Sequence, residues 1–581
     1  MEIDESKKSK QTIGTKKPMR KVKNALDVFS PSKTIIGAAA LMMVAVLLTK
    51  FFGFLRLALM GSIIDPKGLL LFNAANTIPE VIFNIIALGS INSAIIPTIT
   101  KAFEKKGKEQ VNETMSSVLN LGVLLFIVCA VIVFVLAMPI AYLLVGTNRN
   151  NHFSAEDIEK MSSMIRILTL SPIILALSST LASLLQIQRK FFITQIAPLF
   201  YNFGIIISIY TFVPMMHGDP IGLCYGVILG SILHLLCELP SFKGTGYKFK
   251  LGYINLKDKF IKEIGILMIP RSMGLAAEQA AFLIQTSLAL SLFDNSLNIY
   301  KFALSLRDIP ISFFGMTLSQ AVFPSLSEDA NKETFDDFNE KLRYTFQQIF
   351  FLVIPATVFF IVLRLPIVRI TYGIFKGHFT FDIINRISWV LLFLSFTIIF
   401  QSLLNLLVRS YYALSNTFIP FIVSIMVIVI ETILSFVFIY IFQNIFNNSI
   451  GAVAGLALAS TIAGAIGVIT LIIMLNNKCN FIDKKMYISF SKKIMSGMIM
   501  AVCMYLSYKF IDYFIDSSKS VGLILIFVLC FVIGLSSYLA SEYNLLDDDM
   551  KLTAKFFYKF RSALKFIKRK KSEIQNTISN L

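Results

Sequence analysis

The chain has 581 residues, of which 56% are hydrophobic and only 15% are charged. Soluble domains contain about 45–50% apolar and about 25% charged residues, so this composition excludes a soluble protein and indicates an integral membrane protein. The 54 Lys and Arg residues exceed the 35 Asp and Glu residues by 19, which can reflect nucleic-acid binding, anionic lipid or the charge of membrane loops.

After a basic segment of 33 residues, apolar runs alternate with short polar loops up to residue 541. Each run is long enough to cross a hydrocarbon core of about 30 Å as a helix. We expect an all-α polytopic protein with about 14 transmembrane helices, near residues 34–60, 69–99, 116–145, 161–187, 193–214, 220–239, 261–292, 297–325, 345–366, 384–411, 417–443, 450–476, 491–514 and 520–541.

The loop charges predict the orientation in the membrane, because Lys and Arg resist translocation. Most basic residues lie in the two tails and in loops on the side of the N-terminus. An even number of spans with both termini in the cytoplasm fits this distribution, so we expect a multi-pass protein of the cell membrane. The excess of positive charge is then explained mostly by the retention of basic loops and tails in the cytoplasm. No basic soluble domain remains to bind nucleic acid.

The C-terminal tail carries aromatic and aliphatic residues among Lys and Arg at loosely helical spacing, in KLTAKFFYKFRSALKFIKRKK (551–571). This pattern is typical of an interfacial helix on anionic lipid, although a solvated basic tail has the same composition.

Similar segments recur at an offset of roughly 220–230 residues, the pattern of a duplicated unit. NSAIIPTIT (92–100) matches SQAVFPSLS (319–327), and the glycines of the sixth span recur in the twelfth. Six spans per unit predict two six-helix lobes related by a pseudo-two-fold axis along the membrane normal, with two extra C-terminal helices. The expected segments are a basic N-terminal tail (1–33), an N-lobe (34–241), a linker (242–259), a C-lobe (260–476), a loop (477–490), the two extra helices (491–541) and a basic tail (542–581).

Polar side chains at bilayer depth are candidates for function, because they are unfavourable there unless they face protein or water. They form stripes in the first, second, seventh and eighth spans, where a cleft between the lobes would run. The candidate substrate-binding residues are Lys50, Arg56, Asn73, Glu80, Asn84, Arg271, Glu278, Gln279, Gln285, Ser305 and Arg307. Thr77, Lys301 and Asp308 accompany them on the same helices. Pairs such as Arg271 with Glu278 can also be purely structural.

The sequence carries no motif for covalent chemistry and no Cys or His spacing typical of a metal site, so we expect a transporter without catalytic residues or a cofactor. A coupling ion or the membrane potential could drive it. His234 in the sixth span fits either close packing or a proton relay.

Several segments together resemble the MurJ/MviN lipid II flippases of the MOP exporter superfamily. They include KFFGFLR (50–56), IPEVIFNIIALGSINSAIIP (78–97), PRSMGLAAEQ (270–279), LRDIPISFFGMTLSQAVFPSLS (306–327) and RSYYALSNTFIP (409–420). The resemblance implies two lobes around a central cavity, a lipid-tail groove formed by the last two helices, and lipid II, an undecaprenyl-linked peptidoglycan precursor, as cargo moved to the outer leaflet. It also implies a protein that works as a monomer, near cell-wall synthesis proteins.

The chain departs from the family pattern at charged positions. Lys50 replaces the first of two arginines, Glu80 and Asn84 bound a segment that has lost an arginine pair, and Ser305 replaces another arginine. We expect Arg271 to compensate in part. The losses leave open a flippase for another polyprenyl-diphosphate glycan, a MATE-like antiporter, or a membrane scaffold for cell-wall synthesis that transports nothing.

Overall fold

The computed structural model describes residues 35–545, with gaps at 89–94, 146–152, 189, 243–246, 293–294, 331, 333, 446–448 and 518. The two basic tails predicted at 1–33 and 542–581, with the amphipathic segment 551–571, lie outside the described residues apart from the first four residues of the second tail. Throughout the described part the regular structure is helical.

The helices follow the predicted hydrophobic runs. The first half of the chain contains α1 (Ile35–Ile63), α2 (Pro66–Phe83), η2 (Asn84–Leu88), α3 (Ile96–Val135), α4 (Ala137–Val145), α5 (Ala155–Leu168), α6 (Leu170–Ile187), α7 (Phe191–Tyr210), α8 (Phe212–Met215) and α9 (Ile221–Phe242). The second half contains α10 (Lys259–Leu290), α11 (Ser296–Pro310), η4 (Ile311–Met316), α12 (Thr317–Asp329), α13 (Asp336–Val362), α14 (Arg364–Thr371), η5 (Gly373–Phe375), α15 (Phe381–Ala413), α16 (Phe418–Tyr440), η6 (Ile441–Ile445) and α17 (Ser449–Cys479). The last two helices are α18 (Lys484–Phe514) and α19 (Ser520–Leu545).

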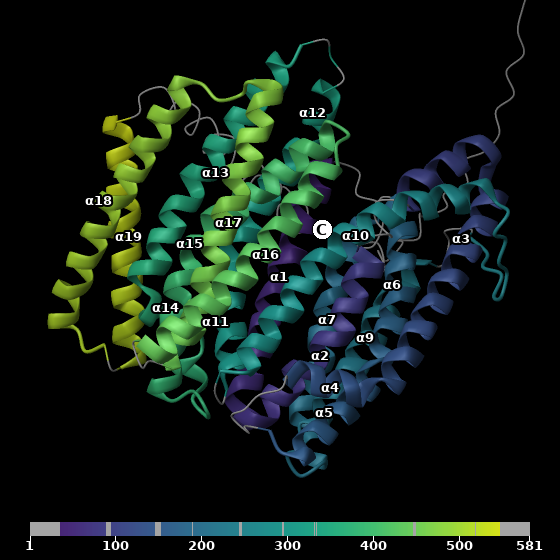
Figure 1. Ribbon diagram of the computed structural model, residues 1–581, viewed down its shortest axis with the longest axis horizontal. Coiled ribbons are helices and arrows are strands. Elements are labelled where there is room, and N and C mark those ends of the chain that lie inside the picture. The colour runs from purple at the N-terminus through teal and green to yellow at the C-terminus, as the bar shows by residue number, and fades with distance from the viewer. Residues whose placement is uncertain are drawn as a thin grey trace, which may run out of the picture.

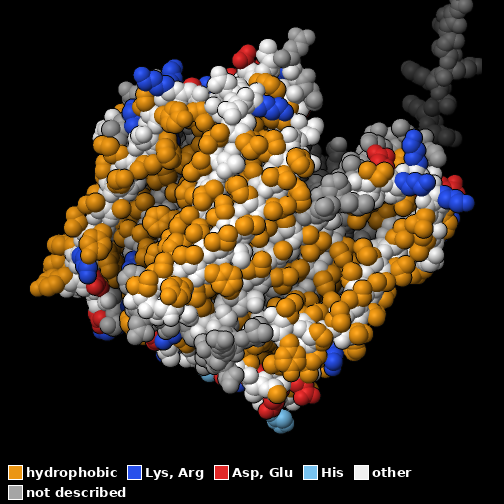
Figure 2. Space-filling view, in the orientation of Figure 1, with side chains coloured by type: hydrophobic (Ala, Val, Ile, Leu, Met, Phe, Trp, Pro, Cys, Tyr) orange, Lys and Arg blue, Asp and Glu red, His pale blue; other side chains and the backbone are white. Residues whose placement is uncertain are grey.

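Thirteen helices in the described part of the chain are long and apolar enough to span a membrane. The seventh predicted span corresponds to α10, whose apolar stretch Leu275–Leu290 is shorter. Figure 2 shows a broad belt of hydrophobic side chains, with many Lys and Arg side chains gathered toward the ends of the molecule. This surface fits a bilayer, because lipid replaces water around the belt.

The helices form two bundles, one from each half of the chain, that meet at one end and splay apart at the other (Figure 1). In the N-terminal bundle α7 packs against α1 and α9, and in the C-terminal bundle α15 and α16 pack against α17. Figure 2 shows a notch in the surface between the bundles at the splayed end. The predicted two-lobe transporter architecture is confirmed.

The internal repeat is visible in local structure. η2 follows α2, and η4 follows α11 at the matching position of the second half. Both are π-helical, and their starts, Asn84 and Ile311, are 227 residues apart, the same offset that separates Pro97 from Pro324. Each half of the chain thus has one π-turn at a matching position, after α2 and after α11. Such turns often accompany functional sites.

Close packing within the N-terminal bundle depends on glycine. A Cβ at Gly204 of α7 would lie 2.2 Å from the backbone nitrogen of Gly230, and one at Gly230 would lie 2.4 Å from the carbonyl oxygen of Tyr201. The small residues of the sixth span therefore allow α7 and α9 to approach backbone to backbone, as expected for small-residue interfaces in membranes.

The segment between the two bundles is bound to α3. Asn112, Ser116 and Ser117 accept hydrogen bonds from the backbone nitrogens of Lys248 (3.2 Å), Lys250 (3.0 Å) and Asn255 (3.2 Å), respectively. At its end, Asp258 caps α10 and accepts hydrogen bonds from Gln110 and Thr114 of α3. The start of α10 is therefore attached to the N-terminal bundle, while its later residues contact α16 of the other bundle.

The two extra helices stand at the outer edge of the C-terminal bundle. α18 and α19 pack against each other, α18 also packs against α13, and α19 contacts α14. Figure 1 shows them on the side farthest from α3. This position outside both repeat units is the one that the sequence predicts for the last two spans, whose lipid-tail role stays a prediction.

Candidate functional site

The two bundles are joined by hydrogen bonds near the end where α1 finishes and α2 begins. Asn73 Nδ2 of α2 donates to Asn298 Oδ1 of α11 at 2.7 Å, and Asn298 Nδ2 donates to the carbonyl of Pro66 at 2.9 Å. Ser62 Oγ donates to the carbonyl of Phe375 at 2.9 Å, and the backbone nitrogen of His378 donates to the carbonyl of Ser62 at 3.2 Å. The seam is closed at this end.

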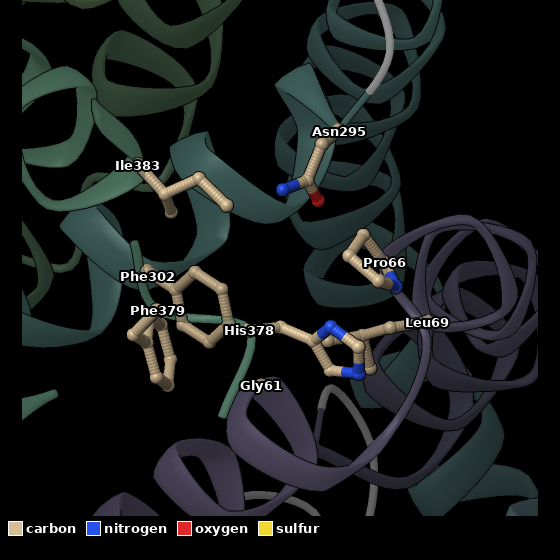
Figure 3. Close-up of a pocket in the computed structure, with 8 residues that line it drawn as sticks. All are labelled: Gly61, Pro66, Leu69, Asn295, Phe302, His378, Phe379 and Ile383. Atoms are coloured by element: carbon tan, nitrogen blue, oxygen red, sulfur yellow. The ribbon is translucent and has the colours of Figure 1, made fainter. Parts of the chain in front are cut away.

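A small pocket marks the closed end of the seam (Figure 3). Its lining comes from α1, α2, α11, α15 and the loops before α11 and α15, and consists of Gly61, Pro66, Leu69, Asn295, Phe302, His378, Phe379 and Ile383. Figure 3 shows the His378 ring beside Leu69 and Pro66, facing the N-terminal bundle, with Phe302 and Phe379 to its left. The pocket is mainly apolar and small, so we assign it to the closed gate rather than to a cargo site.

Further along the seam, toward the splayed end, charged groups from three helices act on one another. Lys301 of α11 donates to the carbonyl of Asn73 at 3.0 Å and to the hydroxyl of Thr77 at 3.5 Å. Arg56 of α1 and Glu80 of α2 both interact electrostatically with Lys301. Two cations and one carboxylate from both halves of the chain therefore share one part of the seam.

Aromatic rings accompany these charges. The guanidinium carbon of Arg56 lies 6.0 Å from the centre of the Tyr201 ring, and Lys301 Nζ lies 5.9 Å from the centre of the Phe282 ring. The Nε atom of Arg56 is buried and has no hydrogen-bond partner among the residues that the structure describes. The guanidinium thus keeps a donor that a phosphate or carboxylate of a ligand could use.

One predicted pair, from the second and seventh spans, meets along the same seam. Asn84 Nδ2 donates to Gln279 Oε1 at 3.3 Å, which joins η2 to α10. Glu80 and Glu278 are exposed, as is Lys50 on α1. α10 includes Arg271, but its side chain lies outside the described residues.

Three predicted residues have partners inside the C-terminal bundle. Gln285 is buried and donates to Ser435 of α16 at 3.0 Å, and the Ser305 hydroxyl lies 2.7 Å from the hydroxyl of Tyr372. Arg307 forms an ion pair with Asp308, with Nη2 and Oδ1 2.7 Å apart, and interacts electrostatically with Glu431. The structure does not bring these three side chains together with Arg56 and Glu80.

The central cation of the seam, Lys301, was not among the candidate binding residues. It lies one turn before Ser305 on α11, and Asn298 lies three residues before it. Asn298, Lys301 and Ser305, spaced by three and four residues, form a polar stripe on α11, and this spacing is the sequence signal that indicates Lys301.

A family model described as lipid II flippase MurJ matches residues 69–524. The chain belongs to the lipid II flippase MurJ family. Similar relatives include proteins named probable lipid II flippase MurJ from Vibrio cholerae serotype O1, 23% identical over 414 residues (70% of this chain and 77% of the relative), and from Thermotoga maritima, 24% identical over 424 residues (71% and 79%).

Solved structures share the fold. A lipid II flippase MurJ in an inward closed conformation matches with a TM-score of 0.71 and 23% identity, covering 88% of this chain and all (100%) of the solved chain. An inward-facing multidrug resistance MATE family transporter of the MOP superfamily matches with a TM-score of 0.60 and 14% identity, covering 76% and 98%. The chain is thus a MurJ-family membrane transporter, as the resemblance predicted, and not an enzyme.

Proposed function

We propose that this chain moves lipid II from the inner to the outer leaflet by alternating access, with the diphosphate of the cargo bound in the seam between the bundles. Membership of the lipid II flippase MurJ family supports the cargo. The observation that carries the binding site is the unpaired donor of Arg56, beside Lys301 and Tyr201. Lipid II in turn needs a polar passage for its head, while its polyprenyl tail can remain in lipid.

The charge of the seam favours an anionic head. Arg56 and Lys301 carry two positive charges against the one negative charge of Glu80, which leaves a net positive charge for a diphosphate. The direct contacts would come from Arg56, Lys301, Asn73 and Asn84, with Lys50, Arg271, Glu278 and Gln279 along the path. Gln285, Ser305 and Arg307 would act indirectly, by holding α10 and α11 in place.

The orientation follows from charge. The excess of Lys and Arg on the side of the N-terminus supports cytoplasmic termini, so the closed end of the seam would face outward and the splayed end inward. Transport then requires the hydrogen bonds between α2 and α11 to break on the outer side, as the bundles rock against each other.

Other partners follow from the same reasoning. The basic C-terminal tail 551–571 would bind anionic lipid of the inner leaflet. One chain supplies both halves of the transport path, so the protein would work as a monomer. It would act near cell-wall synthesis proteins.

The test uses cells depleted of their own lipid II flippase and the purified chain in vesicles that contain fluorescent lipid II. Arg56→Ala and Lys301→Ala should each abolish rescue and slow flipping at least tenfold, which corresponds to about 1.4 kcal/mol, the range of a lost charge-assisted hydrogen bond. Lys484→Ala, at an exposed position on α18, is the matched control and should behave as wild type.

The outcomes separate the alternatives. If the wild-type chain inserts in the membrane but neither rescues the cells nor flips lipid II, the cargo is wrong, and vesicles with other polyprenyl-diphosphate glycans come next. If the chain rescues but both alanine variants retain full rates, the cargo is right and the proposed binding site is wrong.

A further inference from the structure

A chain of three polar side chains lies between α6 and α9, away from the seam, with Ser178 and Glu238 buried and His234 partly buried. Ser178 Oγ of α6 donates to Glu238 Oε2 of α9 at 2.7 Å. The same hydroxyl lies 2.7 Å from Nδ1 of His234, one turn earlier on α9. Glu238 has no exposed surface. Two titratable groups are thus bridged by one hydroxyl inside a membrane span.

Within the described part of the chain, no cation forms an ion pair with Glu238. Its Oε1 atom is buried without a hydrogen-bond partner in the described part of the chain, and α6, α7 and α8 contain no Asp, Glu, Lys, Arg or His. Lys190, near the end of α9, donates instead to the carbonyl of Ser241 at 2.6 Å. An ionised carboxylate in this position is strongly disfavoured, because burial removes its water and no positive charge among the described side chains replaces it.

Among the side chains that the structure describes, the charged ones on the other helices that pack against α6 and α9 are engaged elsewhere or exposed. On α9 itself, Cys237 is the immediate neighbour of Glu238. On the other helices, Glu80 lies near Lys301, and Glu113, Asp157 and Lys160 form ion pairs with Lys250, Lys67 and Asp219, respectively. Arg166 lies over the Phe134 ring, and Glu109, Glu156 and Glu159 are exposed.

Counting protons shows what the three side chains require. With an ionised carboxylate, Ser178 donates its single proton to Oε2, so His234 takes part as the Nδ1–H donor and the buried carboxylate keeps its negative charge. One added proton removes the net charge and keeps both hydrogen bonds: either Glu238 donates to Ser178 and Ser178 donates to His234, or His234 donates to Ser178 and Ser178 donates to Glu238. Both arrangements have no net charge, and the two interconvert when the proton passes through the hydroxyl.

We propose that Ser178, His234 and Glu238 form a binding site for one exchangeable proton, and that binding and release of this proton accompany the transport cycle. Release of the proton leaves one negative charge on the buried carboxylate between α6 and α9. Both helices contact α2, the helix that carries Asn73, Thr77 and Glu80. A change in α6–α9 packing would therefore reach the seam, and flipping would depend on pH. This inference rests on the proposed function only for its coupling to flipping; the proton site itself stands without it.

The first test measures the proton directly, on the full chain in lipid vesicles. Infrared difference spectra between low and high pH should show a carboxylic C=O band that disappears in Glu238→Gln, and proton uptake should fall by about one proton per molecule. The substituted side chain would keep the hydrogen bonds, because its amide donates to Ser178 as a protonated carboxyl does. Ser171→Ala is the control, because the buried Ser171 and Ser231 hydroxyls, 2.8 Å apart, join the same helices without a titratable group.

The second test measures coupling. Wild-type flipping should change at least threefold across the pH range in which the carboxyl band titrates, and Glu238→Gln should flip at a pH-independent rate, while Ser171→Ala keeps the dependence. A carboxyl band unaffected by Glu238→Gln overturns the proton site. A titrating band with the same pH dependence of flipping in wild type and Glu238→Gln overturns the coupling. If no variant flips lipid II, including wild type, the proposed cargo fails while the spectra still decide the proton site.

Discussion

Asn298 offers the sharpest test of how the two bundles are held together. Its side chain is 1% exposed and makes two of the hydrogen bonds between α11 and α2: it accepts from Asn73 at 2.7 Å and donates to Pro66 O at 2.9 Å. Asn298→Ala removes both bonds. At about 0.5–1.5 kcal/mol for each bond, the closed end should lose about 1–3 kcal/mol relative to the opened state, a shift of about 5-fold to 150-fold in that equilibrium.

The assay is a distance measurement by spin labels on cysteines introduced at Glu156 of α5 and Phe381 of α15, two exposed positions in different bundles, after removal of the native cysteines. The variant should show a larger population with the labels far apart. Asn405→Ala is the control, because the Asn405 amide donates only to Gln401 in its own helix. If Asn298→Ala gives the same distance distribution as Asn405→Ala, the α2–α11 hydrogen bonds do not hold the gate.

Three further predictions concern two glycines that pack against neighbouring backbone and the linker before α10. Gly377→Ala should favour the opened state in the same distance assay, because Gly377 has a φ of +61° and a Cβ there would lie 2.0 Å from the carbonyl oxygen of Ser62; unchanged distances would contradict the role of this loop as a gate. Gly230→Ala should destabilise the N-terminal bundle by about 1–3 kcal/mol, visible as a lower thermal unfolding temperature in detergent, whereas Gly122→Ala, where a Cβ would meet nothing within 4 Å, should leave it unchanged. Asp258→Ala removes the cap of α10 and both bonds from α3, so proteolysis of the segment before α10 should become faster; equal rates in the variant and in wild type would show that these bonds do not restrain it.

The fold was predictable because its main determinant is local. Runs of apolar residues long enough to cross a bilayer define helices without knowledge of their partners. The repeat was predictable for a similar reason, since the segment around Pro97 recurs at Pro324 and the structure adds a π-turn at the matching position of each half.

The site was harder to predict because helix periodicity gives a face but not the partner of that face. The spacing of Asn73, Thr77 and Glu80 places them on one face of α2, and the structure shows that this face meets α11. The stripe on α10 splits: Gln279 meets η2, whereas Gln285 reaches Ser435 in the other bundle. Ser305 is bound by Tyr372, from a segment 67 residues away, and no local pattern reports such a contact. The roles of these residues in transport stay predictions.

The hydrogen bonds between the linker and α3 help to hold the two halves of the chain together. The first turn of α10 is held by Gln110 and Thr114, and a later turn is held by Ser435. Ser287, near the end of α10, also donates to the carbonyl of Leu144 on α4. α10 is therefore hydrogen-bonded to both bundles, whether or not the peptide chain before it is intact. A protein cut within 243–246 and expressed as two polypeptides should then reassemble in the membrane and complement as the single chain does, and gene fission at this point would be tolerated.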